Sequence, residues 1–264
     1  MKLSGQLSGG QRSWRPAIQL WLSAIQLCLS AVPRFGRPGT AGNDSDNDSD
    51  TDLVRAARAT GVSDERVLAA MAATPRAAFA PPGYAWASYS DRPVPIPHGL
   101  VTTQPSLVAA MIAGLGLTGR EHVLEIGSGY GYQTALLARL AEDVVSIEIY
   151  PDIAGAARRN LIRRGIANVR VITGDGTEGY LEGAPYDAIL ISAAHPEVPL
   201  PLIEQLREGG RLVQPIGPGG NEEVILFERI PAGLRQLRVV ATACFVRLRG
   251  RYGFAYPLGE PLAE

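Results

Sequence analysis

The feature that most constrains the fold of this chain is the stretch VLEIGSGYGY, which spans residues 123–132. Its first four residues have the apolar character of a short buried strand, and an apolar helical pattern follows the glycines. A strand that ends in glycines and continues as a helix places backbone N–H groups around a ligand. The glycines follow GxGxG spacing rather than the GxGxxG of dinucleotide-binding folds, and the acidic Glu125 lies near the end of the strand. Both features favour S-adenosylmethionine over NAD as the ligand.

The pattern from residue 121 onward alternates between strand and helix. Apolar runs typical of strands occur at residues 123–126, 144–148, 169–173, 188–191 and 211–214. Helical patterns occur at residues 133–141, 152–164 and 198–207. This alternation predicts an α/β, Rossmann-like fold with a mostly parallel, doubly wound sheet. Two later strand patterns, at residues 222–228 and 238–246, predict an antiparallel edge.

Acidic residues at the ends of the predicted strands extend the ligand hypothesis, because ligands of open α/β sheets bind at the carboxyl ends of the strands. Glu148 follows Gly127 by 21 residues, a spacing that brings a carboxylate to the hydroxyl groups of a ribose. By itself it is read equally well as an exposed carboxylate, and the glycine turn upstream favours the ribose role. Asp175 and Gly176 follow the third strand and are interpreted either as a contact to the adenine amine or as a simple Asp-Gly turn.

A proline-rich stretch, DRPVPIPHGLVTTQ at residues 91–104, precedes the glycine turn. Its alternating prolines favour an extended chain through Ile96, and Pro105 is typical of the first position of a helix. Thr102 and Thr103 lie just before that helix and have two interpretations. They cap the helix, or they hold a carboxylate at its N-terminus, where free N–H groups and the helix dipole favour an anion.

The composition argues against several other kinds of function. The formal net charge is -1, which leaves no basic footprint for nucleic acid. Two cysteines and three scattered histidines provide neither a disulfide framework nor the spacing of metal ligands, so we expect no metal. Sparse cysteines are typical of a reducing compartment. We therefore expect a cytoplasmic protein that binds neither nucleic acid nor membrane.

Residues 1–51 are interpreted as an N-terminal extension. Residues 17–32 form an apolar stretch with the outline of a secretory signal, but it is too short and too polar for a transmembrane helix. We favour a disordered extension or an upstream translation start over a signal, because S-adenosylmethionine is a cytosolic metabolite. Residues 43–52, NDSDNDSDTD, are interpreted as an acidic, solvated linker.

The remainder is expected to be a single domain, residues 52–264, that begins with short helices at residues 53–60 and 63–73. Its predicted parts are an N-terminal substrate-cleft segment (52–104), a cofactor-binding core (105–217) and C-terminal strands (218–264).

Over residues 91–217 the chain resembles the protein-L-isoaspartate O-methyltransferase family, which belongs to the class I methyltransferases. The segments that carry the resemblance are DRPVPI, VTTQP, VLEIGSGYGYQTALLA, VVSIE, NVRVITGDGTEG, APYDAILISAA and PLIEQLREGGRLVQPIG. The resemblance implies a Rossmann-like class I methyltransferase fold and S-adenosyl-L-methionine as cofactor. It also implies methyl transfer to the carboxylate of L-isoaspartyl or D-aspartyl residues in damaged proteins, which begins their repair through a succinimide.

The resemblance further implies roles for individual residues. Thr103 is expected to be the catalytic residue that positions the acceptor, although the family usually carries serine there. Threonine keeps the hydroxyl but adds a methyl group and restricts χ1, so the shape of the acceptor pocket is expected to differ. The residues expected to bind substrate are Ile96, Thr102, Thr103 and Gln104. The residues expected to bind the cofactor are Glu125, Gly127, Ser128, Gly129, Gly131, Glu148, Asp175 and Gly176.

The expected reaction places few demands on the protein, because a carboxylate acceptor is already ionised near neutral pH and needs no strong general base. Two alternatives stay open. The chain methylates a normal aspartate in a dedicated peptide, or it is a non-catalytic adaptor of the same fold that recognises damaged protein. The intact glycine turn, with Glu148 and Asp175, disfavours the adaptor. We expect a monomer.

Overall fold

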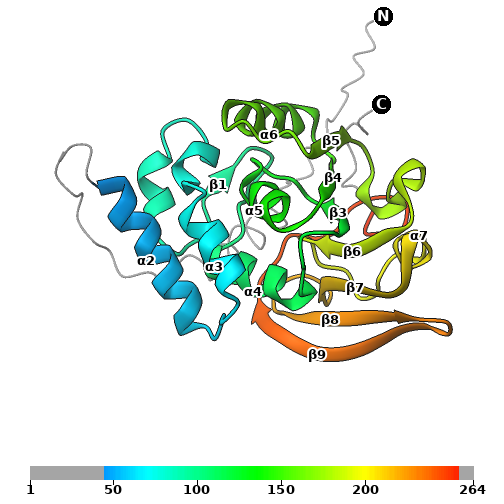
Figure 1. Ribbon diagram of the computed structural model, residues 1–264. Helices are drawn as coiled ribbons and strands as arrows, with labels where there is room; N and C mark the ends of the chain where they lie inside the picture. Colours follow the sequence, from blue (N-terminus) through cyan, green and yellow to red (C-terminus); the bar gives the residue numbers. More distant parts are fainter. Residues whose placement is uncertain (1–44, 256–264) are drawn as a thin grey trace, which may run out of the picture. The chain divides into compact units, whose positions relative to one another are not determined.

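The computed structural model describes residues 45–255, and its central element is a seven-stranded sheet (Figure 1). The strand order is β5-β4-β3-β6-β7-β8-β9. The first five strands run parallel, and β8 pairs antiparallel with both β7 and β9. The strands are β3 (His122–Ile126), β4 (Asp143–Glu148), β5 (Val169–Thr173), β6 (Tyr186–Ile191), β7 (Leu206–Ile216), β8 (Glu222–Ile230) and β9 (Gly233–Ala243). The predicted α/β class with an antiparallel edge is confirmed.

Strand β3 lies in the middle of the parallel part of the sheet, as its apolar sequence predicts. Ile126, its last residue, is opposite Ile147 of β4 and Ile191 of β6. The chain runs outward from β3 through β4 to β5 and then crosses back to β6 on the other side of β3. Such a reversal of strand order creates a crevice at the carboxyl ends of the strands, where ligands of doubly wound folds bind.

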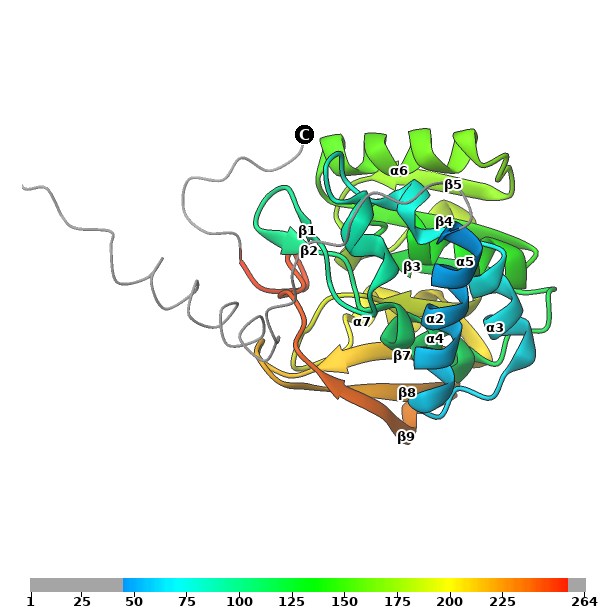
Figure 2. The same ribbon diagram turned by 90° about the vertical axis from the view of Figure 1, so that its left-hand side faces the viewer.

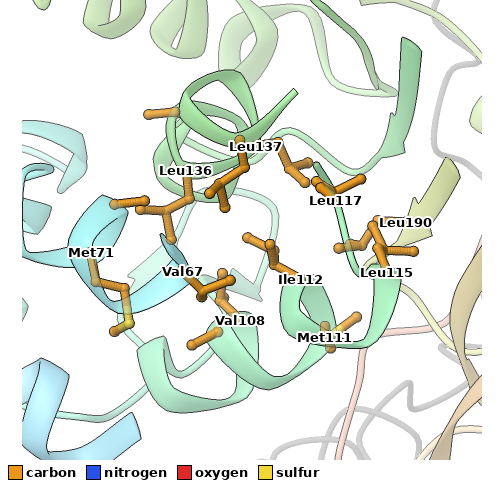
Figure 3. Close-up of a cluster of buried hydrophobic side chains, with 14 of the residues drawn as sticks. Val67, Met71, Val108, Met111, Ile112, Leu115, Leu117, Leu136, Leu137 and Leu190 are labelled. Atoms are coloured by element: carbon orange, nitrogen blue, oxygen red, sulfur yellow. The ribbon is translucent and has the colours of Figure 1, made fainter. Parts of the chain in front are cut away.

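Helices cover one face of the sheet. They are α2 (Ser45–Ala59), α3 (Glu65–Ala72), α4 (Pro105–Leu115), α5 (Tyr132–Leu140) and α6 (Pro151–Arg163). Figures 1 and 2 show α2, α3 and α4 grouped together, and they pack against one another. Their buried side chains join those of α5 and the sheet in one apolar cluster, part of which Figure 3 shows. This core holds α4 in place, and with it the segment that precedes α4.

The other face carries shorter elements. They are α7 (Leu200–Gln205) and the 3-10 turns η3 (Gly176–Glu178) and η4 (Leu181–Gly183). A second apolar cluster lies beneath them and includes Leu124, Ile147, Ile189 and Leu202. Because β3 and its neighbours are covered on both faces, their residues are apolar in near-continuous runs rather than in alternation.

The segment before α4 contains a small hairpin. It follows the 3-10 turns η1 (Arg76–Phe79) and η2 (Ala85–Tyr89) and pairs β1 (Pro95–Ile96) with β2 (Leu100–Val101). His98 and Gly99 form its tip with φ angles of 60° and 66°. Positive φ at both central residues is the pattern of a type I′ turn, whose twist matches that of the paired strands.

Several element boundaries differ from the sequence expectation, and three of the differences have a physical reason in the structure. Helix α2 begins at Ser45, inside the acidic stretch 43–52 that was expected to be a linker. Leu53 and Ala57 of this helix are buried and anchor it to the domain. The polar composition of residues 43–52 does not indicate that these later residues anchor the helix. Helix α7 has six residues rather than the predicted ten, because the chain enters β7 at Leu206. Strand β9 begins at Gly233, five residues early, because pairing with β8 continues along exposed polar residues.

Within residues 45–255, no helix is long and apolar enough to cross a membrane. Among the described side chains, those of residues 52–255, no group of three or more histidine, cysteine, aspartate or glutamate residues is arranged to hold a metal ion. The signal-like segment 17–32 lies outside the described residues.

Candidate active site

The glycine turn joins β3 to α5 at the carboxyl end of the sheet. Gly127, Gly129 and Gly131 have φ angles of 95°, 52° and 93°, which residues with side chains rarely adopt. The N–H of Gly127 donates to the carbonyl of Ile147 at 2.8 Å and so ties the turn to β4. No described atom lies within 4 Å of the point where a Cβ of Gly129 would stand. The outer side of the turn at Gly129 therefore offers space to a ligand.

Glu148 ends β4 and lies against this turn. Its side chain is buried (5% exposed), and its Oε2 accepts a hydrogen bond from the N–H of Gly129 at 2.9 Å. Its Oε1 accepts a longer bond, 3.2 Å, from the N–H of Tyr150. Burial raises the pKa of Glu148 above its ordinary value, although these N–H groups act in the opposite direction. The structure thus brings the two predicted cofactor elements, carboxylate and turn, into contact.

Glu125 lies beneath the turn and is completely buried. Its carboxylate accepts hydrogen bonds from Gln133 at 2.8 Å and from the hydroxyls of Thr134 and Ser146. The hydroxyl of Ser128 bonds in turn to that of Ser146. Burial raises the pKa of Glu125, against the effect of these three donors. Glu125 and Ser128 therefore join β3, β4 and α5 below the turn, and their predicted contact with cofactor stays a prediction.

Asp175 follows β5 and is held by two segments. Its Oδ1 accepts from the N–H and hydroxyl of Thr177 at 2.8 and 2.7 Å. Its Oδ2 accepts from the N–H of Arg251, in the C-terminal segment, at 2.7 Å. Gly176 lies so close to β3 that a Cβ there would stand 2.4 Å from Cγ2 of Ile126. The glycine is therefore required sterically, and the adenine contact of Asp175 stays a prediction.

The two neighbouring threonines before α4 differ in their surroundings. The hydroxyl of Thr102 accepts from Nη2 of Arg76 and from the N–H of Val94, each at 3.0 Å. Thr103 is half-buried, and its hydroxyl has no hydrogen-bond partner among residues 45–255. Of the two predicted substrate hydroxyls, that of Thr102 is thus engaged within the fold, and the substrate contact of Thr103 stays a prediction.

The N-terminus of α4 is occupied by Asp91. Its Oδ1 accepts from the N–H of Ser106 at 2.8 Å, and its Oδ2 accepts from the side chain of Gln104 at the same distance. The hypothesis that threonine hydroxyls cap this helix is therefore wrong, because an aspartate 15 residues upstream does so. Ile96, predicted to contact substrate, is buried at 9% exposure.

Arg76 is the residue of this region that sequence reasoning missed most completely. It is 3% exposed and donates to the carbonyls of Ser90 at 2.9 Å and Arg92 at 2.7 Å, besides Thr102. Burial lowers its pKa to about 10, against the influence of Tyr132 and Asp91. Its partners lie 14 to 26 residues away along the chain, so no local pattern indicates them.

A hollow of about 350 Å³ lies elsewhere, at the amino ends of β3 and β4. His122, Asp143, Arg170 and Tyr180 are among its lining residues. It is at the opposite end of these strands from the glycine turn, so we do not assign it to the candidate site.

Comparison with known families gives a match over most of the described chain. The profile of the family described as Protein-L-isoaspartate(D-aspartate) O-methyltransferase (PCMT) matches residues 48–253. A protein-L-isoaspartate O-methyltransferase of Methanoculleus marisnigri is 48% identical over 204 residues, which cover 75% of this chain and 89% of the relative. One of Anaeromyxobacter dehalogenans is 48% identical over 190 residues, 71% of this chain and 91% of the relative.

Solved structures agree with the sequence comparison. A protein-L-isoaspartate O-methyltransferase matches with a TM-score of 0.70 and 31% identity, covering 77% of this chain and 67% of that one. A putative enzyme of the same name from Plasmodium falciparum, in complex with S-adenosyl-L-homocysteine, matches with a TM-score of 0.64 over 77% of this chain and 98% of that one. At 22% identity the latter likeness supports the fold alone.

Proposed function

We propose that this chain, which belongs to the protein-L-isoaspartate(D-aspartate) O-methyltransferase family, methylates the carboxylate of isoaspartyl residues in damaged proteins. The methyl donor in this proposal is S-adenosylmethionine. The observation that carries the proposal is the contact between Glu148 and Gly129, 2.9 Å, at the carboxyl edge of the sheet. This contact places the carboxylate predicted to bind the ribose hydroxyls against the glycine turn, whose outer side is open at Gly129.

The cofactor side of the proposed site consists of the glycine turn and Glu148. The carboxylate of Glu148 is buried and receives hydrogen bonds from the backbone N–H groups of Gly129, Tyr150 and Ile149. A carboxylate offers about four lone-pair sites, so Glu148 retains acceptor capacity for a hydroxyl group of a ribose. Gly129 leaves the backbone open to a ligand, because no described atom lies within 4 Å of the point where its Cβ would stand. When bound, S-adenosylmethionine supplies an electrophilic methyl group on a sulfonium.

The acceptor side is Thr103. Its hydroxyl, which has no partner among the described residues, would donate a hydrogen bond to the acceptor carboxylate and orient it. Because the carboxylate is ionised near neutral pH, Thr103 has no proton to remove. Orientation and exclusion of water are then the main contributions of the protein. The methyl ester formed is attacked by the following backbone nitrogen, which expels methanol and gives a succinimide that hydrolyses in part to normal aspartate.

We further propose a cytoplasmic monomer whose partners are damaged proteins or peptides. The sparse cysteines support the reducing compartment in this proposal. The second candidate function is methylation of a normal aspartate in a dedicated peptide. The threonine at position 103, where the family usually carries serine, favours it by changing the shape of the acceptor pocket.

One experiment separates these functions. Labelled S-adenosylmethionine is incubated with the enzyme and an isoaspartyl peptide or its normal aspartyl twin. Repair activity predicts label in the isoaspartyl peptide alone. Equal labelling of the two peptides, or of neither, contradicts the repair function, and label in the normal peptide alone supports the dedicated-peptide function.

A further inference from the structure

The hairpin that leads to Thr103 meets the cofactor side of the proposed site through His98. The ring of His98 stacks on that of Tyr150, with centroids 4.0 Å apart and planes inclined by 8°. Its Nε2 lies 2.9 and 3.1 Å from the two carboxylate oxygens of Asp152. One side chain of the hairpin thus contacts two residues at the start of α6.

These contacts connect the two halves of the site. Thr103 follows His98 by five residues and lies two residues after the end of β2. On the other side, the N–H of Tyr150 donates to Oε1 of Glu148 at 3.2 Å. One ring stack and one hydrogen bond therefore separate the acceptor segment from the carboxylate proposed to hold the ribose.

The backbone of His98 supports a functional reading of its orientation. Among residues 45–255 it is the one non-glycine residue with a positive φ. Such conformations persist where surrounding contacts determine them, and they concentrate at functional sites. A turn with two positive φ angles favours asparagine or glycine at this position, so the histidine ring occupies a place where the backbone prefers another residue.

The contact with His98 also affects the protonation of Asp152. Partial burial raises the pKa of Asp152, but the hydrogen bond and charge of His98, together with backbone N–H groups, lower it below its ordinary value. The side chains of His98 and Asp152 are 38% and 58% exposed. Exposed ion pairs contribute little to stability, so the consequence of this contact lies in where it holds the hairpin.

We propose that His98 is a positioning residue that couples occupancy of the cofactor site to placement of the acceptor segment. The inference rests on the proposed function. A ligand at Glu148 orders the chain on which the His98 ring rests, and the ring holds the hairpin that carries Thr103 near its working position. By linkage, cofactor and peptide then raise each other's affinity by one common factor.

The test measures the affinity for S-adenosylhomocysteine by calorimetry, with and without a saturating isoaspartyl peptide. The variant is His98→Asn, because asparagine accepts positive φ but has no aromatic ring. We expect the peptide to tighten binding about fivefold in the wild type, the lower end of typical couplings, and by less than about twofold in the variant. His98→Gln, which also lacks the ring, is the second variant and is expected to lose the coupling as well.

The matched control is His122→Asn. His122 also stacks on a tyrosine, Tyr186, with centroids 4.6 Å apart, and bonds to an aspartate, Asp143, at 2.5 Å, but at the amino ends of the strands. We expect wild-type coupling in this control. Equal coupling in the wild type and His98→Asn, or equal loss in His122→Asn, overturns the inference while leaving methyl transfer intact. Failure of the wild type to bind S-adenosylhomocysteine would instead overturn the proposed function, and the inference with it.

Discussion

The parallel strands carry similar side chains in different surroundings at their amino ends (the amino edge) and at their carboxyl ends (the carboxyl edge). At the amino edge, His122 bonds to Asp143 and to the carbonyl of Gly183 at 2.7 Å, and it stacks on the buried Tyr186. These partners belong to the sheet itself or to the turn beside it. At the carboxyl edge, His98 makes corresponding contacts from the tip of a separate hairpin. The same kinds of contact join neighbouring strands at one edge and join the hairpin to the start of α6 at the other.

The carboxylates of the two edges differ in the same way. Glu121, just before β3, accepts hydrogen bonds from the N–H groups of Thr118, Gly119 and Arg120 at 2.9 to 3.0 Å. Partial burial raises its pKa, but these bonds and that of the Thr118 hydroxyl lower it to about 2. At Glu148 burial prevails and the pKa rises. The carboxylate of Glu121 is held by three backbone N–H groups and a hydroxyl of its own turn. The carboxylate of Glu148 retains capacity to accept further hydrogen bonds.

The strongest test of this contrast is removal of one carboxylate at each edge. We expect Glu148→Ala to weaken binding of S-adenosylhomocysteine about 10- to 100-fold, because hydrogen bonds to a charged group contribute about 1.5–3 kcal/mol. Calorimetric titration measures the change. The matched variant Asp143→Asn, at the amino edge, should bind within about twofold of wild type. An unchanged affinity of Glu148→Ala would remove Glu148 from the ribose role.

A smaller effect is expected on the acceptor side. Thr103→Val should lower kcat/KM for an isoaspartyl peptide about 3- to 10-fold, the loss of one neutral hydrogen bond, with cofactor affinity unchanged. Steady-state methylation kinetics provide the measurement, and Thr103→Ser should retain activity. The control is Thr118→Val, which removes a hydroxyl that bonds to Glu121 at the amino edge. If Thr118→Val slows transfer as much as Thr103→Val, the assignment of Thr103 is contradicted.

The smallest effect concerns stability as a function of pH. Glu121 has a lowered folded-state pKa, so its stabilisation is present above its ordinary value near 4.5 and is lost as pH falls toward 2. We expect Glu121→Gln to melt about 2–4 °C below wild type at pH 7 and to converge with it near pH 2.

Glu148 should show the opposite sign. Its folded-state pKa is raised from 4.5, so stability is full below that value and is lost as pH rises through the raised pKa. Without ligand, the melting temperature of Glu148→Gln should therefore be higher than that of the wild type at pH 7 and equal to it at low pH. Thermal melts between pH 2 and pH 8 compare the two variants. Parallel melting curves for Glu121→Gln and Glu148→Gln would abolish the distinction between the two edges.

Much of the carboxyl edge is predictable because its signals are local. Strand β3, the glycine turn and α5 are consecutive, and glycine adopts the positive φ angles at 127, 129 and 131 without the steric cost that a side chain brings. Glu148 is predictable because the length of one helix and one strand fixes its distance from the turn. The roles of Ile96, Gln104, Glu125 and Asp175 in binding remain predictions, since each of these residues is buried or engaged with other parts of the protein.

The sequence by itself determined the α/β class, the order of the main strands and helices, and the glycine turn with its carboxylate. Periodicity and turn chemistry act over a few residues, so they can be read along the chain. Only the tertiary structure decided that Asp91 caps α4, that Arg76 holds Thr102, and that His98 reaches Asp152 across 54 residues. These contacts depend on how the segments pack, and no local pattern encodes which distant polar group will satisfy a buried donor. Packing also distinguishes Thr102 from its neighbour Thr103, because it supplies hydrogen-bond partners to the hydroxyl of Thr102.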